Sequence, residues 1–269
     1  MIERKDMLGL VDAKPEEIRE ILDTAANMKK LLRQGIKKLP HLEGCTATIL
    51  FYENSTRTRT SFELAAKYMG ATTINIAASS SSVAKGETLV DTGKTLDAMK
   101  NDFIIIRHPM GGAPYLLART VKASVLNAGD GMNEHPTQAP LVLCTMREKF
   151  GKIEGLKVAI LGDIKHSRVA KSDLFGLTKL GAEVRMFAPE TLIPKGIDRL
   201  GAKLCASREE AVEGADVVMG LRIQLERQEA GNFPSLNEYA EFYGVNEKVL
   251  SLASPDAIVM HPGPVNRGV

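Results

Sequence analysis

The stretch that decides the fold reads Ile49-Leu50-Phe51-Tyr52-Glu53-Asn54-Ser55-Thr56-Arg57-Thr58-Arg59-Thr60-Ser61-Phe62-Glu63. The apolar run over 47–52 predicts a strand, and apolar residues at helical spacing from Phe62 to Met69 predict a helix that stops at Gly70. Five hydroxyl side chains and two arginines lie between the strand and Phe62. The chain is therefore expected to pass from a strand through a tight turn directly into a helix N-terminus.

This turn has the chemistry of an anion site. The first N–H groups of a helix have no intrahelical partner, and the helix dipole is positive at that end. The hydroxyls of Ser55, Thr56 and Thr58 and the forked guanidinium of Arg57 favour the same ligand, a phosphate. An ordinary helix cap by Ser55 or Thr56 is the structural alternative. The stretch contains neither of the glycine-rich nucleotide-binding patterns, so a nucleotide loop is not expected.

Length and composition narrow the class of protein. A chain of 269 residues can form two domains, and 44% hydrophobic with 25% charged residues is typical of a globular protein. A net charge of +2 without a basic run argues against a nucleic-acid partner. The chain shows no long apolar run and no signal-peptide pattern, so we expect no membrane segment and a cytoplasmic location. Cys45, Cys144 and Cys205 are far apart in sequence and are expected to be reduced core thiols.

Strand-like and helical patterns alternate along the whole chain. Strands are expected at 46–52, 72–77, 103–106, 124–127, 157–163, 183–188, 202–206, 216–220 and 257–261. Apolar strands that alternate with helices indicate an α/β fold with two doubly wound domains, each with a central parallel sheet flanked by helices. The expected division is a first domain over 1–134, an interdomain helix over 135–150 and a second domain over 151–269.

Cationic and neutral donor side chains collect at the predicted carboxyl ends of the strands, where ligands bind in doubly wound sheets. Besides the 55–59 cluster, these residues are Arg107, His135, Gln138, Arg168, Arg222, Gln224 and the segment His261-Pro262-Gly263-Pro264. Asp130 and Asp163 are the conspicuous acids at these ends. Such a site suits a doubly anionic ligand and an acyl transfer in which charge develops on one oxygen.

Each of these residues also has a purely structural interpretation. Arg107 could form an ion pair, His135 could be an ordinary polar residue at a helix start, and Lys85 could be solvated in its serine-rich loop. The histidines and cysteines lack the spacing of a metal site, and a G-x-S-x-G nucleophile motif is absent. We therefore expect neither a metal nor a cofactor.

Several segments, taken in order and spacing, resemble the carbamoyltransferase superfamily. They are Ser55-Thr56-Arg57-Thr58-Arg59, Lys85-Gly86-Glu87, Arg107-His108-Pro109, His135-Pro136-Thr137-Gln138 and His261-Pro262-Gly263-Pro264. Within the superfamily, Arg222-Ile223-Gln224 and Asn127-Ala128-Gly129-Asp130-Gly131 are similar to the branch that acts on aspartate. The ornithine branch would carry a His-Cys-Leu-Pro segment, and this chain has Pro262 where that cysteine would be.

The resemblance implies a role for each matching residue. Ser55, Thr56, Arg57, Thr58 and Arg107 would hold the phosphate of carbamoyl phosphate. Thr58, Arg107 and His135 would polarise the carbamoyl oxygen, while Gln138 and the backbone at Gly263 and Pro264 would hold the carbamoyl amide. Arg168, Arg222 and Gln224 would bind the aspartate carboxylates, and Ser81 and Lys85 would serve the site of a neighbouring subunit.

The same resemblance implies carbamoyl transfer from carbamoyl phosphate to the α-amine of L-aspartate, an early step of pyrimidine biosynthesis, by a cytoplasmic homotrimer with shared active sites. Association with a regulatory chain or a dihydroorotase is left open. One alternative is transfer to another amino acid such as ornithine. A second is a non-catalytic anion-binding homologue. Chains of the family continue past the segment matching Asn266-Arg267-Gly268 into a terminal helix on the first domain, so the apolar stripe at Ile18, Ile21 and Leu22 is expected to lack part of its partner.

Overall fold

The computed structural model describes residues 2–77, 86–224, 227 and 235–265. The chain divides into two compact units, Met1–Thr137 and Gln138–Val269. Within the described ranges, none of the helices combines the length and the apolar character needed to cross a membrane.

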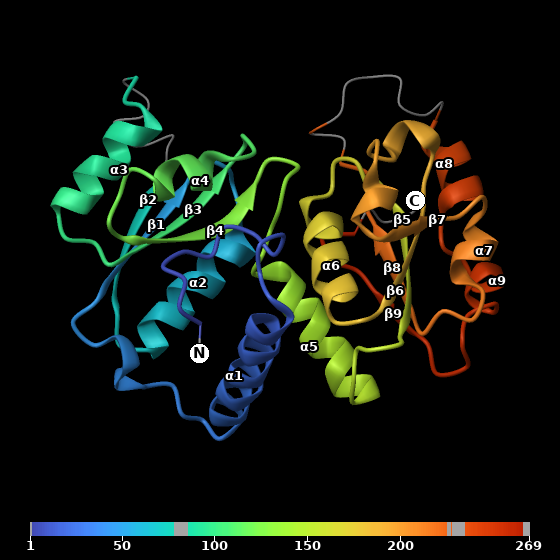
Figure 1. The fold of residues 1–269 in the computed structure, drawn as a ribbon, viewed down its shortest axis with the longest axis horizontal. Helices are drawn as coiled ribbons and strands as arrows, with labels where there is room; N and C mark the ends of the chain where they lie inside the picture. The colour runs from blue at the N-terminus through green and yellow to red at the C-terminus, as the bar shows by residue number, and fades with distance from the viewer. Residues whose placement is uncertain (1, 78–85, 225–226, 228–234, 266–269) are drawn as a thin grey trace. The chain divides into compact units, whose positions relative to one another are not determined.

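A four-stranded parallel sheet forms the centre of the first unit (Figure 1). Its strands are β1 (Thr46–Phe51), β2 (Thr72–Ala77), β3 (Phe103–His108) and β4 (Ser124–Asp130), in the order β2-β1-β3-β4. The helices are α1 (Pro15–Arg33), α2 (Thr56–Tyr68), α3 (Leu89–Ala98) and α4 (Ala113–Ala118), with a short 3-10 helix η1 (Pro40–Leu42). β2 and β3 lie on opposite sides of β1, so the order in which successive strands are added to the sheet reverses between β1 and β3. This position is the topological switch point of the sheet.

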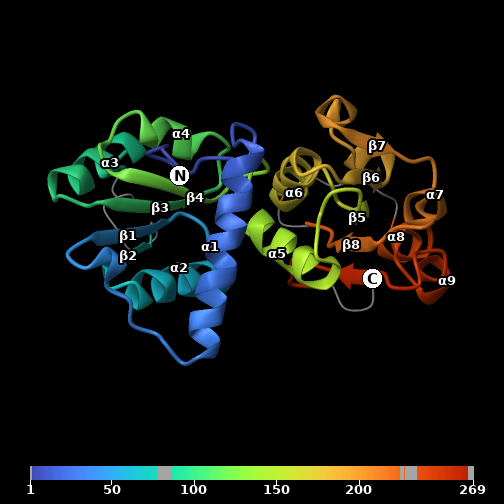
Figure 2. The ribbon, with the colours of Figure 1, turned by 60° about the horizontal axis from the view of Figure 1, so that its bottom comes forward.

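Helices cover both faces of this sheet. Figure 2 shows α3 and α4 on one side of the sheet and α2 on the other, with the long helix α1 running past the sheet near β4. Successive side chains of a strand point to opposite faces, so Ile104 and Ile106 of β3 pack with Leu117 of α4. Ile105 between them packs in the cluster that contains Ala66 of α2. Both faces of the central strands β1 and β3 are buried, which is why these two strands are mainly apolar, whereas the edge strand β2 is more exposed.

The second unit repeats this arrangement around a five-stranded parallel sheet of order β7-β6-β5-β8-β9. Its strands are β5 (Lys157–Gly162), β6 (Glu183–Phe187), β7 (Ala202–Leu204), β8 (Val217–Leu221) and β9 (Ile258–Met260). Its helices are α5 (Gln138–Phe150), α6 (Arg168–Lys179), α7 (Arg208–Val212), α8 (Leu236–Tyr243) and α9 (Glu247–Leu250), with 3-10 helices η4 (Glu190–Leu192) and η5 (Ile197–Leu200). The topological switch point of this sheet lies between β5 and β8. Gly162, at the end of β5, has a φ of +118° and lies so close to the Leu221 carbonyl that a side chain would collide with it.

The predicted fold class, two doubly wound domains each with a central parallel sheet flanked by helices, is confirmed. Several element boundaries differ from the prediction, most of them by one or two residues, and two of the larger differences lie next to the predicted site. β4 extends to Asp130, and α5 begins at Gln138 instead of His135, because Glu134 is held in a short antiparallel bridge with Asp130 that delays the helix. The assignment of an interdomain helix to 135–150 stays a prediction.

Candidate active site

The first turn of α2 presents an open N-terminus. Ser55 is the residue before the helix, with extended φ and ψ of −160° and 103°, and its side chain makes no capping hydrogen bond within the described chain. The first helical bond runs from the Arg59 N–H to the Ser55 carbonyl at 3.3 Å. Thr56 and Arg57 are exposed. The ordinary capping role for Ser55 is therefore wrong, and its side chain does not satisfy any of the first N–H groups of the helix.

Arg107 lies at the carboxyl end of β3, directly opposite Phe51 of β1 in the sheet register. Its Nε donates to Glu53 Oε2 at 3.1 Å, and its Nη1 donates to Thr58 Oγ1 at 3.2 Å. The side chain is only 13% exposed. Thr58 and Arg107, separated by 49 positions in sequence, are thus brought together at the β1/β3 switch point.

Glu53 was not singled out from the sequence, although it follows β1 and Arg107 ends the neighbouring strand. That spacing is the signal that could have found the pair. Because the carboxylate balances part of the guanidinium charge, Glu53 fixes the orientation of Arg107 as well as its position. The predicted ion pair of Arg107 is real, and it exists together with the contact to Thr58.

His135 is 6% exposed and follows a tightly held segment. Its Nδ1 lies 3.3 Å from the hydroxyl of Thr137. The preceding Glu134 is buried, and its carboxylate accepts the N–H of Leu10 at 2.8 Å. His135 is therefore fixed in a preformed loop, as a residue that aligns a substrate needs to be.

A second histidine lies next to Arg107. The ring of His108 packs against that of Tyr52 with centroids 4.6 Å apart, and its Nδ1 accepts the Met110 N–H at 3.0 Å. Burial lowers the pKa of His108, and the nearby carboxylates of Glu53 and Asp130 only partly oppose this effect. In its neutral form His108 carries no positive charge, so it does not compete with Arg107 for the carboxylate of Glu53.

In the second unit, three predicted substrate-binding residues follow β5 and β8. Arg168 opens α6 after a cap formed by Ser167, and it is 3% exposed. Arg222 follows β8, donating through Nη1 to the Ile223 carbonyl at 3.1 Å and through Nη2 to Gln224 Oε1 at 3.4 Å. The sequence prediction that Arg222 and Gln224 act together is consistent with this contact.

Asp163 organises the same region and was noted in the sequence only as an acid at a strand end. It is fully buried, and its Oδ2 accepts the Gln224 N–H at 3.0 Å. Its Oδ1 accepts from His166, at 2.8 Å from Nδ1 and 3.2 Å from the backbone N–H. Arg227 in turn donates to the His166 carbonyl at 3.0 Å. One carboxylate thus ties the loop after β5 to the segment 222–227.

The remaining predicted residues fall into three groups. Gln138 is the first residue of α5. The segment after β9 forms a tight turn in which the Gly263 N–H donates to His261 Nδ1 at 2.7 Å, and the Gly263–Pro264 peptide is cis. Ser81 and Lys85 lie outside the described residues, so their predicted roles are not tested.

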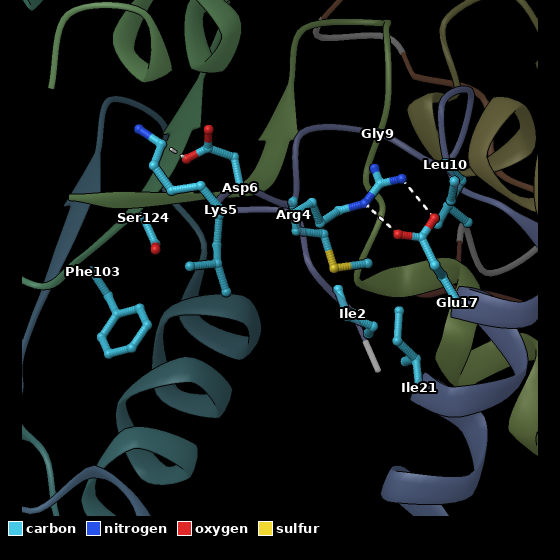
Figure 3. A pocket seen from close by; sticks show the side chains of 13 residues that line it. Ile2, Arg4, Lys5, Asp6, Gly9, Leu10, Glu17, Ile21, Phe103 and Ser124 are labelled. Carbon is cyan, nitrogen blue, oxygen red and sulfur yellow. Dashed lines mark hydrogen bonds and ion pairs between the residues drawn. The ribbon is translucent and has the colours of Figure 1, made fainter. Parts of the chain in front are cut away.

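A cavity of about 300 Å³ lies elsewhere in the first unit (Figure 3). Its walls include the N-terminal segment, Ile21 of α1, and Phe103 and Ser124, the first residues of β3 and β4. Figure 3 shows Arg4 and Glu17 pointing toward one another across its rim, where they form an ion pair with contacts of 2.6 and 2.8 Å. The cavity is at the amino ends of the strands, and the candidate site is at their carboxyl ends.

The fold and these strand-end residues define a class of protein, and sequence comparison identifies it. Residues 5–148 match the carbamoyl-P binding domain of the aspartate/ornithine carbamoyltransferases, and residues 154–269 match their Asp/Orn binding domain. The chain belongs to the aspartate/ornithine carbamoyltransferase family.

Individual relatives place it more narrowly. It is 62% identical to the aspartate carbamoyltransferase catalytic subunit of Ruminiclostridium cellulolyticum and 61% identical to that of Acetivibrio thermocellus, in both cases over 100% of this chain and 86% of the relative. Among solved structures, aspartate transcarbamoylase of Trypanosoma cruzi in complex with carbamoyl phosphate and aspartate aligns with a TM-score of 0.85 at 30% identity, over 97% of this chain and 86% of that one. Ornithine carbamoyltransferase of Pyrococcus furiosus aligns with a TM-score of 0.87 at 32% identity, over 98% and 86%.

Proposed function

We propose that the chain transfers the carbamoyl group of carbamoyl phosphate to the α-amine of L-aspartate, giving N-carbamoyl-L-aspartate and phosphate. The observation that carries this proposal is the contact of Thr58 with Arg107 beside the open N-terminus of α2. It supplies an anion site in which one arginine and one hydroxyl can reach both a phosphate and an adjoining carbonyl oxygen. The catalytic subunits at 61–62% identity support the same substrates.

The proposed reaction needs no covalent enzyme intermediate. The deprotonated amine of aspartate attacks the carbamoyl carbon, a tetrahedral oxyanion forms, and the C–O bond to phosphate breaks as the amine proton leaves with the phosphate. Ser55, Thr56, Arg57 and Arg107 hold the phosphate, and Thr58, Arg107 and His135 stabilise the oxyanion. Alignment of two substrates can contribute about 7–11 kcal/mol, and each oxyanion donor about 3–4 kcal/mol.

The preference for aspartate rests on the second unit. Arg168, Arg222 and Gln224 provide cationic and amide donors for two carboxylates, whereas ornithine would present an ammonium group to them. The fold alone does not separate the two activities, since the aspartate and ornithine enzymes align with TM-scores of 0.85 and 0.87. In the proposed site, Gln138 and the backbone of Gly263 and Pro264 hold the carbamoyl amide.

The family resemblance also motivates a quaternary proposal. We infer a cytoplasmic homotrimer in which Ser81 and Lys85 of one subunit complete the site of the next. This assembly would explain why a loop rich in serine, with one lysine, precedes α3.

A direct assay tests the function. The protein is supplied with carbamoyl phosphate and either L-aspartate or L-ornithine, and both the carbamoylated product and the released phosphate are quantified. We expect N-carbamoyl-L-aspartate and phosphate in equal amounts, and no citrulline. Formation of citrulline would favour the ornithine activity, and phosphate binding without any product would favour a non-catalytic homologue.

A further inference from the structure

One buried carboxylate in the first unit has no role in the proposed chemistry, although it lies at its edge. Asp130, the last residue of β4, is 0% exposed. Four donors converge on it. Asn127 Nδ2 at 2.8 Å and the Glu134 N–H at 3.1 Å reach Oδ1, and the Gly112 N–H at 2.8 Å and Asn133 Nδ2 at 3.1 Å reach Oδ2. An ionised carboxylate has about four acceptor positions, so all are used.

Asn127 belongs to β4 itself, and the other three donors come from two different loops. The Gly112 N–H belongs to the turn that follows Arg107 at the end of β3, and the Glu134 N–H immediately precedes His135. The backbone reinforces the link, because the Gly131 N–H donates to the His108 carbonyl at 2.8 Å. Gly131, at a φ of +51°, lies so close to the Pro109 carbonyl that a side chain would collide with it.

We propose that Asp130 is a positioning residue that sets the spacing between Arg107 and His135, two of the three groups that address the carbamoyl oxygen. This inference rests on the proposed function. Asp130 acts through the two loops and does not touch the substrate. Misplacement of aligned groups by about 1 Å can cost about 100-fold in rate. Loss of the Asp130 carboxylate should therefore lower kcat more than it weakens ligand binding.

Asp130→Asn is the test variant. It preserves the shape, but it replaces one acceptor oxygen with an amide NH₂ that must face donors already present on that side. Of the four side chains proposed to hold the phosphate, Ser55, Thr56 and Arg57 lie at the start of α2, and only Arg107 would be displaced. We therefore expect kcat to fall by about 100-fold, while the Kd of inorganic phosphate rises by less than about tenfold.

Asp97→Asn is the matched control. The Asp97 carboxylate also accepts two backbone N–H groups, from Lys122 at 2.8 Å and Ala123 at 2.9 Å, but these lie at the amino end of β4. The kcat of Asp97→Asn should stay within about twofold of wild type. Its stability can still fall, because the variant loses a carboxylate that accepts two backbone N–H groups. Calorimetric titration with inorganic phosphate counts competent sites per chain, so a loss of folded protein is distinguished from a loss of kcat per site.

If Asp130→Asn fails to fold, Asn133→Ala removes only one of the four donors and should lower kcat per site by about three- to tenfold. An Asp130→Asn protein whose kcat per site stays within about threefold of wild type would overturn the inference. So would an equal loss in Asp97→Asn. Wild-type protein that binds phosphate but makes no carbamoyl-aspartate would instead refute the proposed function, and this inference with it.

Discussion

Arg107 illustrates how one residue can serve structure and chemistry together. Its Nε is paired with Glu53, and this contact directs Nη1 at Thr58 Oγ1. Sequence analysis left an ion pair and a ligand contact as alternatives, because strand-end position alone does not show which way a guanidinium points. The carboxylate that orients it comes from Glu53, just after a strand that is adjacent in the sheet but distant in sequence.

Arg107→Ala should abolish most turnover while the fold is retained. Removing a charged donor from a developing oxyanion typically costs about 10²–10³ in kcat. Arg185→Ala is the matched control, because Arg185 also pairs a carboxylate, that of Glu183 at 2.7 Å, but lies on β6 of the second unit. Steady-state assays and circular dichroism would be measured for both variants. Near-normal turnover of Arg107→Ala would refute its role.

Asp173 of α6 is a buried carboxyl group that lowers the stability of the folded protein. It is 0% exposed, and neither carboxylate oxygen has a hydrogen-bond partner among the described residues. Burial therefore raises its pKa well above the usual range. Between the unfolded pKa of about 3.9 and the raised pKa of the folded state, folding must take up a proton that the unfolded chain does not hold. The stability of the protein should thus fall as pH rises above the unfolded pKa.

Asp173→Asn should remove this pH-dependent cost. We expect the variant to be more stable than wild type at pH 7, by about 1.4 kcal/mol for each unit by which the pKa is raised. The advantage should vanish at about pH 2.5, where both states of the wild type are protonated. Urea unfolding at the two pH values measures it, with exposed Asp256→Asn as the control. An equal effect at both pH values would contradict the assignment.

At the scale of elements, β1/β3 and β5/β8 are the pairs that place functional side chains. These strands could be predicted because both faces are covered and their side chains are nearly all apolar. The boundaries of β4 and α5 could not, because Ala128-Gly129-Asp130 has the composition of a turn. It becomes strand because Asp130 pairs with His108 of β3 after a shift in register, and the bridge to Glu134 and the bonds of Asn127 to Leu8 and Asp130 hold it there.

Asp163 anchors the segment after β8 through the Gln224 N–H, so Asp163→Asn should disturb aspartate binding selectively. It weakens the bond to the Gln224 N–H and the interaction with His166 Nδ1. We expect the KM for aspartate to rise about tenfold, the equivalent of about 1.4 kcal/mol, with the Kd of inorganic phosphate unchanged. Asp216→Asn is the control, since Asp216 accepts the Lys157 N–H at 2.8 Å at the opposite end of the same strand pair. Equal KM values in both variants would contradict the anchoring role.

At the scale of the whole molecule, each unit has its own sheet, its own switch point and its own set of strand-end donors. The alternation of strands and helices was sufficient to predict two such units. It could not predict which strand ends become neighbours, because sheet order depends on packing between segments far apart in sequence. Arg107 and Thr58 meet for this reason, as do Asp163 and Gln224.

The proposed trimer predicts that two inactive variants recover activity when mixed, which cannot occur if each site lies within a single chain. If each site uses Arg57 from one subunit and Lys85 from the next, Arg57→Ala and Lys85→Ala chains are each inactive alone. In closed cyclic trimers reassembled from equal amounts of both, about a quarter of the sites combine an intact Arg57 with an intact Lys85. Turnover should therefore recover to about a quarter of wild type.

Unfolding and refolding the mixture, followed by steady-state assay, measures this recovery. Mixing Lys85→Ala with the double variant Arg57→Ala/Lys85→Ala is the control, since it contains no intact Lys85 and must stay inactive. If the first mixture is as inactive as its components although mixed trimers form, Lys85 acts within its own subunit or not at all. Recovery in the first mixture alone would mean that the phosphate site of Ser55, Thr56 and Arg57 at the start of α2 is completed by a second chain.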